Sequence, residues 1–149
     1  MLMKKSPASH FLVALQFASI AVGLVPWAGR PLGSPWWLAL SGLGVLVGLY
    51  TLAHNRPGNF AIYPEPKAEA RLVTSGPYRW VRHPMYLAVL LFMAGIALWN
   101  GTLANQLSLI TLFAALAGKM HREERYLHQY FDGYADYACR CKRLIPFLF

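Results

Sequence analysis

Four apolar runs without a charged residue constrain this chain more than any other feature of its sequence. A membrane-spanning helix needs about 20 consecutive apolar residues, with about 17 as the lower limit. The first two runs meet this limit, whereas the last two meet it only when Pro84 and the residues around Gly118 are included. We therefore predict an all-α integral membrane protein with about four transmembrane helices. The runs are residues 11–28, 36–53, 85–99 and 102–117.

The last two runs are separated by Asn100 and Gly101, a pair typical of a turn. We interpret these runs as a tight helical hairpin, and the alternative is one bent, partly re-entrant element. In the second run, Gly44 and Gly48 have the spacing that lets two helices pack closely in lipid. A nucleotide-binding loop is not supported there, because no strand or βαβ unit surrounds the glycines.

The composition agrees with a membrane protein of one domain. The chain has 149 residues, of which 56% are hydrophobic and only 13% charged, whereas soluble domains are nearer a quarter charged. Within the single membrane domain 1–149, residues 1–54 hold two N-terminal spans and residues 55–149 hold the polar motifs. Cys139 and Cys141 are too close for an ordinary disulfide and lack the complementary ligands of a metal site.

The charge pattern predicts how the spans are oriented. The chain has 14 basic and six acidic residues, a net charge of +8, and the basic residues flank the apolar runs. This placement indicates contact with anionic membrane lipids rather than with nucleic acid. If the spans alternate, every basic residue except Arg30 lies on one side, together with all the acids. The positive-inside rule makes that side cytoplasmic, with both termini there. Lys4 and Lys5 then precede a retained first span rather than a cleaved signal.

The first polar cluster is residues 75–86, which read SGPYRWVRHPMY. Pro84 suits the first position of a helix, where its missing N–H costs nothing. The free N–H groups of that helix end would face the cytoplasm and attract a carboxylate or another anion. His83 is either part of such a site or a simple helix cap. Arg79 and Arg82 belong either to the site or to contacts with lipid phosphates.

The second polar cluster, residues 119–125, follows the last apolar run and reads KMHREER. The carboxylates of Glu123 and Glu124 suit a cationic or hydroxyl-bearing ligand. Lys119 lies one helical turn before Glu123 and shares its face, so the alternative is an ion pair on a solvated helix. We expect the two clusters to meet at one membrane face and to form a site there.

Two further segments surround these clusters. The middle segment, residues 54–83, is rich in proline and apolar residues, which favours an ordered functional loop over a solvated linker. In the tail, the spacing of four tyrosines predicts a packing stripe on one helix face, although Asp132-Gly133 is expected to interrupt that helix. Residues 144–149 are apolar but too short to span, so they should lie at the interface or pack back on the protein. The tyrosines are Tyr126, Tyr130, Tyr134 and Tyr137.

The motifs resemble those of the isoprenylcysteine carboxyl methyltransferase family, and the related phospholipid N-methyltransferases share much of the pattern. The resemblance rests on LVTSGPYRWVRHPMY at residues 72–86, then Glu123-Glu124, Phe131, Tyr137 and Ile145-Pro146. It extends over about half of the chain, and the first two spans match only as generic membrane helices. The family implies an integral membrane methyltransferase that uses S-adenosylmethionine and has no Rossmann domain.

The resemblance also implies roles for individual residues. The cytoplasmic loop and the C-terminal helix would form the cofactor site, and Glu123, with Glu124 beside it, would hold the polar end of the cofactor. Lys119 stands where the animal enzymes have an arginine that orients the acceptor carboxylate. Lysine keeps the charge but loses the bidentate fork. The remaining implied cofactor-binding residues are Leu72, Val73, Tyr78, His83, Pro84, Met85 and Tyr86.

The sequence thus favours methyl transfer from S-adenosylmethionine to a lipid-like acceptor, namely the carboxylate of an isoprenylcysteine-like substrate. A phospholipid or another lipophilic amine is the alternative acceptor. An amine would first have to lose a proton, and His83 and His121 are the candidate bases. A small non-enzymatic membrane protein is the rival reading from a different class. The oligomeric state is not specified by the sequence.

Overall fold

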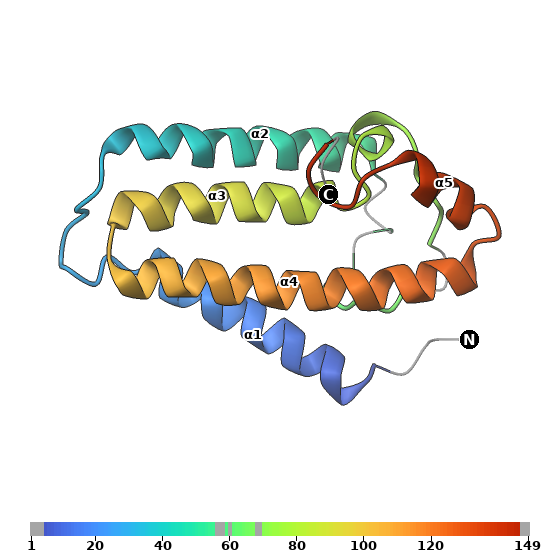
Figure 1. Cartoon of the computed structure of the whole chain (residues 1–149), viewed down its shortest axis with the longest axis horizontal. Helices are drawn as coiled ribbons and strands as arrows, with labels where there is room; N and C mark the ends of the chain where they lie inside the picture. Colours follow the sequence, from blue (N-terminus) through green and yellow to red (C-terminus); the bar gives the residue numbers. More distant parts are fainter. Residues whose placement is uncertain (1–4, 56–58, 60, 68–69, 147–149) are drawn as a thin grey trace.

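The computed structural model describes residues 5–55, 59, 61–67 and 70–146, and this part of the chain is helical without a β-strand. Within this part, the structure has four long helices and a short fifth one, and Figure 1 shows the long helices side by side with α5 at one end of them. The all-α prediction is therefore confirmed. The elements are α1 (Pro7–Leu24), η1 (Pro35–Trp37), α2 (Leu38–His54), η3 (Gly76–Arg79), α3 (Pro84–Asn100), α4 (Leu103–Tyr130) and α5 (Tyr134–Arg140).

Three helical segments in the described part are long and apolar enough to cross a membrane: Pro7–Leu24, Pro35–His54 and Leu103–Tyr130. α3 is apolar as well but has 17 residues, the lower limit for a span. Large apolar side chains such as Phe11, Leu46 and Ile110 are exposed on the outside of the bundle. Many exposed large apolar side chains on the outer faces of helices are typical of lipid contact. The chain is therefore built as an integral membrane protein.

The turn between α3 and α4 is a true hairpin. Gly101 has φ +74°, a left-handed conformation that favours glycine, and its N–H donates to the carbonyl of Ala97. The side chain of Thr102 then accepts from the backbone N–H of Asn105 and caps α4. Two separate helices result, so the hairpin prediction is confirmed and the bent re-entrant alternative is wrong.

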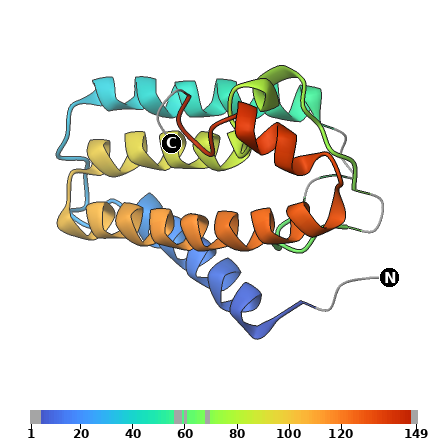
Figure 2. The same cartoon turned by 45° about the vertical axis from the view of Figure 1, so that its right-hand side comes forward.

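The helices pack in two pairs, α2 with α3 and α1 with α4. Figure 1 and Figure 2 both show α2 running along α3, and α1 lying at an angle to α4. Close approach of α2 to α3 requires Gly44, because a Cβ there would lie 2.5 Å from the backbone nitrogen of Phe92 and 2.7 Å from the oxygen of Ala88. The predicted packing role of Gly44 is thus confirmed. A Cβ at Gly48 would lie 3.6 Å from that of Ala88, an ordinary contact.

This contrast gives a first testable prediction. Gly44→Ala should lower the free energy of unfolding in detergent by about 1–3 kcal/mol, because the new methyl group meets backbone that cannot move aside. Gly48→Ala is the matched control on the same helix face and should leave stability near that of the wild type. Thermal unfolding followed by circular dichroism measures both, and equal effects of the two variants would contradict the packing described here.

The polar ends of the elements gather at one end of the bundle. In Figure 1 the start of α1, the end of α2, the start of α3, the end of α4 and all of α5 lie on the right. α4 continues beyond its apolar run through the cluster of residues 119–125 and ends at Tyr130. The two polar clusters of the sequence therefore meet, as expected.

The tail divides as Asp132-Gly133 predicts, but the four tyrosines do not form one stripe. α4 ends before Phe131, which has an extended backbone, and α5 starts at Tyr134 in a new direction. Tyr134 and Tyr137 are buried, whereas Tyr130 is exposed. The single-face prediction is wrong because the turn between the helices breaks the periodicity.

Lys4 lies outside the described residues, as do residues 56–58, 60, 68 and 69 of the middle segment and the last three residues of the apolar segment 144–149. Of that segment, Leu144 is buried and Ile145 is half exposed. Both line an apolar groove with residues of α3 and α4. The part of the tail that the structure describes thus packs back on the protein.

Candidate active site

The motif at residues 75–86 is held in place by a turn and by the tail. Gly76 has φ +58°, and a Cβ there would collide with the ring of His54, so glycine is needed for the η3 turn. After this turn the backbone runs beside the tail: Arg82 N–H donates to the carbonyl of Lys142 at 2.8 Å, and His83 N–H to that of Arg143 at 3.0 Å. These bonds fix the chain just before Pro84 starts α3.

Glu124 lies at the centre of a buried ionic cluster. Arg82 Nε donates to Oε1 at 2.8 Å, Arg143 Nε donates to Oε2 at 3.0 Å, and His83 Nε2 is 3.2 Å from Oε1. Only 9% of the Glu124 side chain is exposed. Arg82 Nη1 also donates to the carbonyls of Ala138 and Cys141. Both carboxylate oxygens are thus occupied by protein groups.

Glu123, the next residue, has different surroundings. Its side chain is 31% exposed, and Oε2 accepts a hydrogen bond from Tyr86 Oη at 2.8 Å. The ring of Tyr86 stacks in parallel on that of His83, with centroids 5.3 Å apart. His83 Nδ1 is 3.8 Å from Glu123 Oε2. Glu123 therefore keeps one oxygen that no described hydrogen bond occupies, and it faces open space.

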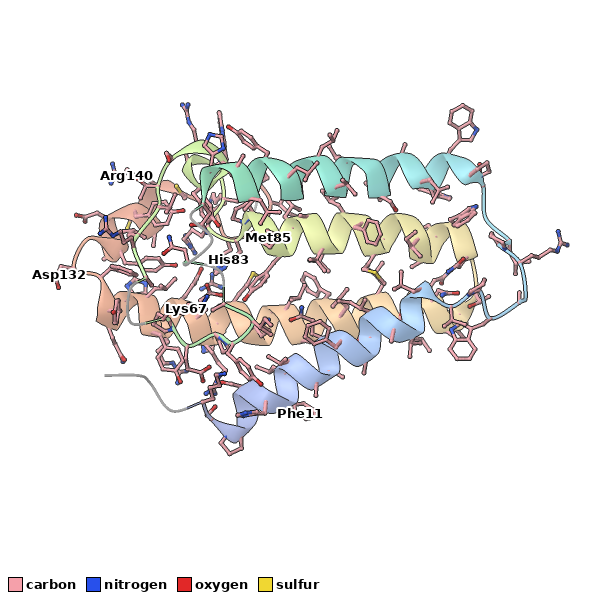
Figure 3. The ribbon with its side chains drawn as sticks, turned by 180° about the vertical axis from the view of Figure 1, so that it is seen from behind. Phe11, Lys67, His83, Met85, Asp132 and Arg140 are labelled. Carbon is pink, nitrogen blue, oxygen red and sulfur yellow. The ribbon has the colours of Figure 1, made fainter. Side chains whose placement is uncertain are left out.

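Two neighbouring cavities of about 110 Å³ and 90 Å³ lie beside Glu123 and share part of their lining. They share the side chains of Tyr78, Arg82 and Glu123 and three residues of the loop after α2. The first cavity is also lined by Leu72, Val73 and the tyrosines of α5, and the second by the start of α3 from His83 to Tyr86. Figure 3 shows His83 and Met85 at the start of α3, at the end of the bundle where the loop bearing Lys67 lies.

The structure thus brings together eight of the nine residues expected around the cofactor. Glu124 is the exception, because it lines neither cavity and its oxygens are engaged. In this cluster the charge of Arg82 is paired with Glu124 rather than with a lipid phosphate. Arg79 is exposed and lies over the ring of Trp80. The eight are Leu72, Val73, Tyr78, His83, Pro84, Met85, Tyr86 and Glu123.

Tyr78 presents a hydroxyl to both cavities. Asn55 Nδ2 donates to its oxygen at 2.8 Å, which leaves the hydroxyl proton available to a ligand. Burial, reinforced by the nearby charge of Glu123, raises the pKa of Tyr78 to about 12 despite the Asn55 bond. The hydroxyl therefore stays protonated at neutral pH and can act as a donor.

The sequence reasoning missed Asn55 and Asn59, which line both cavities. Asn59 donates to Asn55 Oδ1 at 2.8 Å, accepts from the N–H of Arg71 at 2.9 Å and donates to the carbonyl of the same residue. This pair ties the loop to the end of α2. The sequence signal that could have revealed this pair is the presence of two asparagines four residues apart directly after an apolar run.

Lys119 is buried and separate from the cavities. It is 2% exposed, and its Nζ donates to Gln16 Oε1 of α1 at 2.6 Å and lies 5.2 Å from the centroid of the Tyr86 ring. The alternative of an ion pair with Glu123 on a solvated helix is wrong, because the lysine points into the α1–α4 interface. The predicted contact of Lys119 with an acceptor stays a prediction, and Gln16 was not foreseen.

Fold and site define a class: an all-α membrane protein whose loop, third and fourth helices and tail enclose a polar pocket at one end of the bundle. The sequence model of the phospholipid methyltransferase family matches residues 36–133. The chain belongs to this family, and the resemblance inferred from the motifs is confirmed.

Curated relatives extend the match. The chain is 34% identical to the cobalt-zinc-cadmium resistance protein CzcN of Cupriavidus metallidurans, over 91% of this chain and 60% of that protein. It is 32% identical to the protein-S-isoprenylcysteine O-methyltransferase of Saccharomyces cerevisiae, over 70% of this chain and 46% of that protein. It is 27% identical to protein-S-isoprenylcysteine O-methyltransferase B of Arabidopsis thaliana, over 76% of this chain and 61% of that protein. The chain spans about half to three-fifths of the length of these relatives.

Proposed function

We propose that this chain is a membrane methyltransferase that moves a methyl group from S-adenosylmethionine to a lipophilic acceptor. The observation that carries the proposal is the convergence of the family motif on one double cavity. The free carboxylate oxygen of Glu123, the hydroxyl of Tyr78 and the start of α3 all border it. This is the arrangement expected of a ligand site: a concave pocket with a few polar groups placed on rigid elements.

The residues present fit the chemistry of the cofactor. Glu123 suits its ammonium or hydroxyl groups, and the start of α3, a positive helix end, suits its carboxylate. Leu72, Val73 and Phe131 supply an apolar wall for the adenine. Because each cavity is small, a ligand of this size would occupy both. When bound, the cofactor would supply a methyl group on a positively charged sulfur.

The protein's own contribution is alignment and exclusion of water. Tyr86 holds the Glu123 carboxylate at a fixed angle, and the Glu124 cluster holds the start of α3 against the tail. A carboxylate acceptor is already ionised at neutral pH and needs no base. For an amine acceptor, the candidate base His83 is engaged with Glu124, and the candidate base His121 is exposed and bonded to Arg125. This favours the carboxylate of an isoprenylcysteine-like substrate.

A lipophilic acceptor is supported by an apolar groove on the outside of the bundle. Residues of α3, α4 and the tail line it, and it begins at Leu87, one residue after Tyr86. A lipid chain lying in this groove would bring its polar end toward the start of α3. A phospholipid or another lipophilic amine is the second candidate acceptor, because the matching family is that of the phospholipid methyltransferases.

The deciding experiment is transfer of labelled methyl groups from S-adenosylmethionine to a lipid extract by the purified chain in detergent. Transfer to a product that releases the label in base identifies an ester and thus a carboxylate acceptor. Label that resists base identifies an amine. If no label is transferred and the chain does not bind S-adenosylhomocysteine, the proposed function fails and a non-enzymatic role takes its place.

We also propose that the site faces the cytoplasm, and the exposed Cys139 on α5 provides a native reporter. A membrane-impermeant thiol reagent should label Cys139 in inverted membrane vesicles and leave it unlabelled in intact cells or spheroplasts. The buried Cys141 should react in neither case until the protein is denatured. Cys139→Ser is the control for the signal, and labelling from the outer side would contradict the orientation.

A further inference from the structure

Among the described residues, two side chains that line the first cavity each have a buried polar atom without a hydrogen-bond partner. These atoms are Oε2 of Glu65, in the loop between α2 and α3, and the hydroxyl of Tyr134 on α5. Glu65 is 6% exposed and Tyr134 is 1% exposed. A buried polar group without a partner costs about 1–3 kcal/mol, so most such groups in folded proteins are paired. Two of them in one cavity require an explanation.

Both side chains are held firmly while the polar atom stays free. The other oxygen of Glu65 accepts from Ser9 Oγ and from the backbone N–H of Ser6, both at the start of α1. The ring of Tyr134 packs edge-on against His128 and Tyr137. Burial raises the pKa of Tyr134, so its hydroxyl keeps its proton. These neighbours fix the two side chains and leave Glu65 Oε2 and Tyr134 Oη without a partner among the described residues.

No hydrogen bond or ion pair among the described residues reaches Glu65 Oε2. Arg122 lies near, since its Nη2 donates to Ser6 Oγ at 2.7 Å, but its Nε is itself without a partner. None of the ion pairs among the described residues joins Arg122 to Glu65. Arg82, which also lines the cavity, is committed to Glu124. Among the described residues, the free oxygen of Glu65 therefore takes part in no ion pair.

We propose that Glu65 and Tyr134 each add a polar group to the wall of the pocket, and that these groups bind a hydroxyl or ammonium group of the ligand. A carboxylate accepts hydrogen bonds from either group, and a phenol hydroxyl can donate to a hydroxyl or accept from an ammonium. Such a group is present on the ribose and amino-acid parts of the methyl donor and on the headgroups of lipid acceptors. The proposal rests on the proposed function and adds to it two residues outside the motif region 75–86 and the cluster 119–125.

The test uses two neighbouring tyrosines of α5 that differ in one respect. Tyr137 Oη donates to the carbonyl of Tyr78 at 2.7 Å, whereas Tyr134 Oη has no partner among the residues that the structure describes. Tyr137→Phe should therefore lower the unfolding temperature of the ligand-free protein, because the carbonyl loses its hydroxyl donor and keeps only the weak thiol donor Cys141 Sγ at 3.5 Å. Tyr134→Phe should leave that temperature unchanged or raise it, and should weaken ligand binding about tenfold. Glu65→Gln keeps the size of the side chain and should weaken binding by about tenfold or more.

Two probes identify the source of the bound group. S-adenosylhomocysteine, titrated by calorimetry into the full chain in detergent, reports the donor, and the KM for the acceptor lipid reports the acceptor. Weaker binding of the first probe in Tyr134→Phe and Glu65→Gln assigns the subsite to the donor, and a raised KM alone assigns it to the acceptor. If the wild type binds the probe and both variants match it in both measurements, the inference about Glu65 and Tyr134 is overturned while the proposed function stands. Loss of thermal stability in Tyr134→Phe equal to that in Tyr137→Phe would also overturn it. A wild type that neither binds nor transfers overturns the inference and the proposed function together.

Discussion

Glu124→Ala is expected to lower the free energy of unfolding by about 3–5 kcal/mol, the typical effect of removing one partner from a buried ion pair. Glu124 accepts from Arg82 and Arg143 and lies beside His83, and its side chain is 9% exposed. Its removal leaves the buried Arg82 charge without its carboxylate. It also releases the tail, because Arg82 joins Glu124 to the carbonyls of Ala138 and Cys141. Chemical unfolding in detergent, followed by tryptophan fluorescence, measures the loss.

A double-mutant cycle separates the ion pair from its surroundings. Arg82→Ala combined with Glu124→Ala should cost less than the sum of the single changes, since the pair leaves together. Arg143→Ala should have a small effect, because its side chain is 42% exposed and the charge is screened by water. If Glu124→Ala has the stability of the wild type but does not bind the cofactor, Glu124 contacts the ligand, as the family resemblance implies.

The two glutamates also show where sequence reasoning stops. They are adjacent, and neighbouring residues on a helix point about 100° apart, so only one can face the pocket. Which one does so depends on Arg82, which is 42 residues away from Glu124, and on Arg143, which is 19 residues away. The motif alone gives no information on that three-segment contact. The sequence did predict that Glu123 and the start of α3 lie at one site, because each lies next to the end of an apolar run on the same side of the membrane.

Local signals gave the rest of the fold. The spans follow from uncharged apolar runs, the start of α3 from Pro84 and the hairpin from the left-handed Gly101. Contacts between distant segments were out of reach. Lys119 bonds Gln16, 103 residues away, and Glu65 bonds Ser9, 56 residues away. Neither partner carries a pattern of its own, because a lone glutamine or serine in an apolar helix is compatible with many neighbours.

Glu123→Gln is expected to lower kcat/KM for methyl transfer by about 10- to 100-fold, the usual effect of replacing a charged hydrogen-bond partner of a ligand. The amide keeps the size of the side chain but removes the negative charge that a ligand ammonium or hydroxyl would meet. The unfolding free energy should change by less than about 1 kcal/mol, because Glu123 is half-buried and bonded only to Tyr86 among the described hydrogen bonds.

Tyr86→Phe serves as the matched control for the Glu123 change, since it leaves the charge in place and removes only the hydroxyl that holds it at 2.8 Å. We expect a smaller loss of kcat/KM than for Glu123→Gln, with S-adenosylhomocysteine still bound. Calorimetric titration and initial-rate measurements on the same preparations distinguish the two effects. Full activity in Glu123→Gln, with intact folding, would exclude this carboxylate from the site and leave Glu65 as the one acidic side chain of the described pocket. Low activity with a parallel loss of stability would instead place Glu123 with Glu124 among the residues that hold the fold.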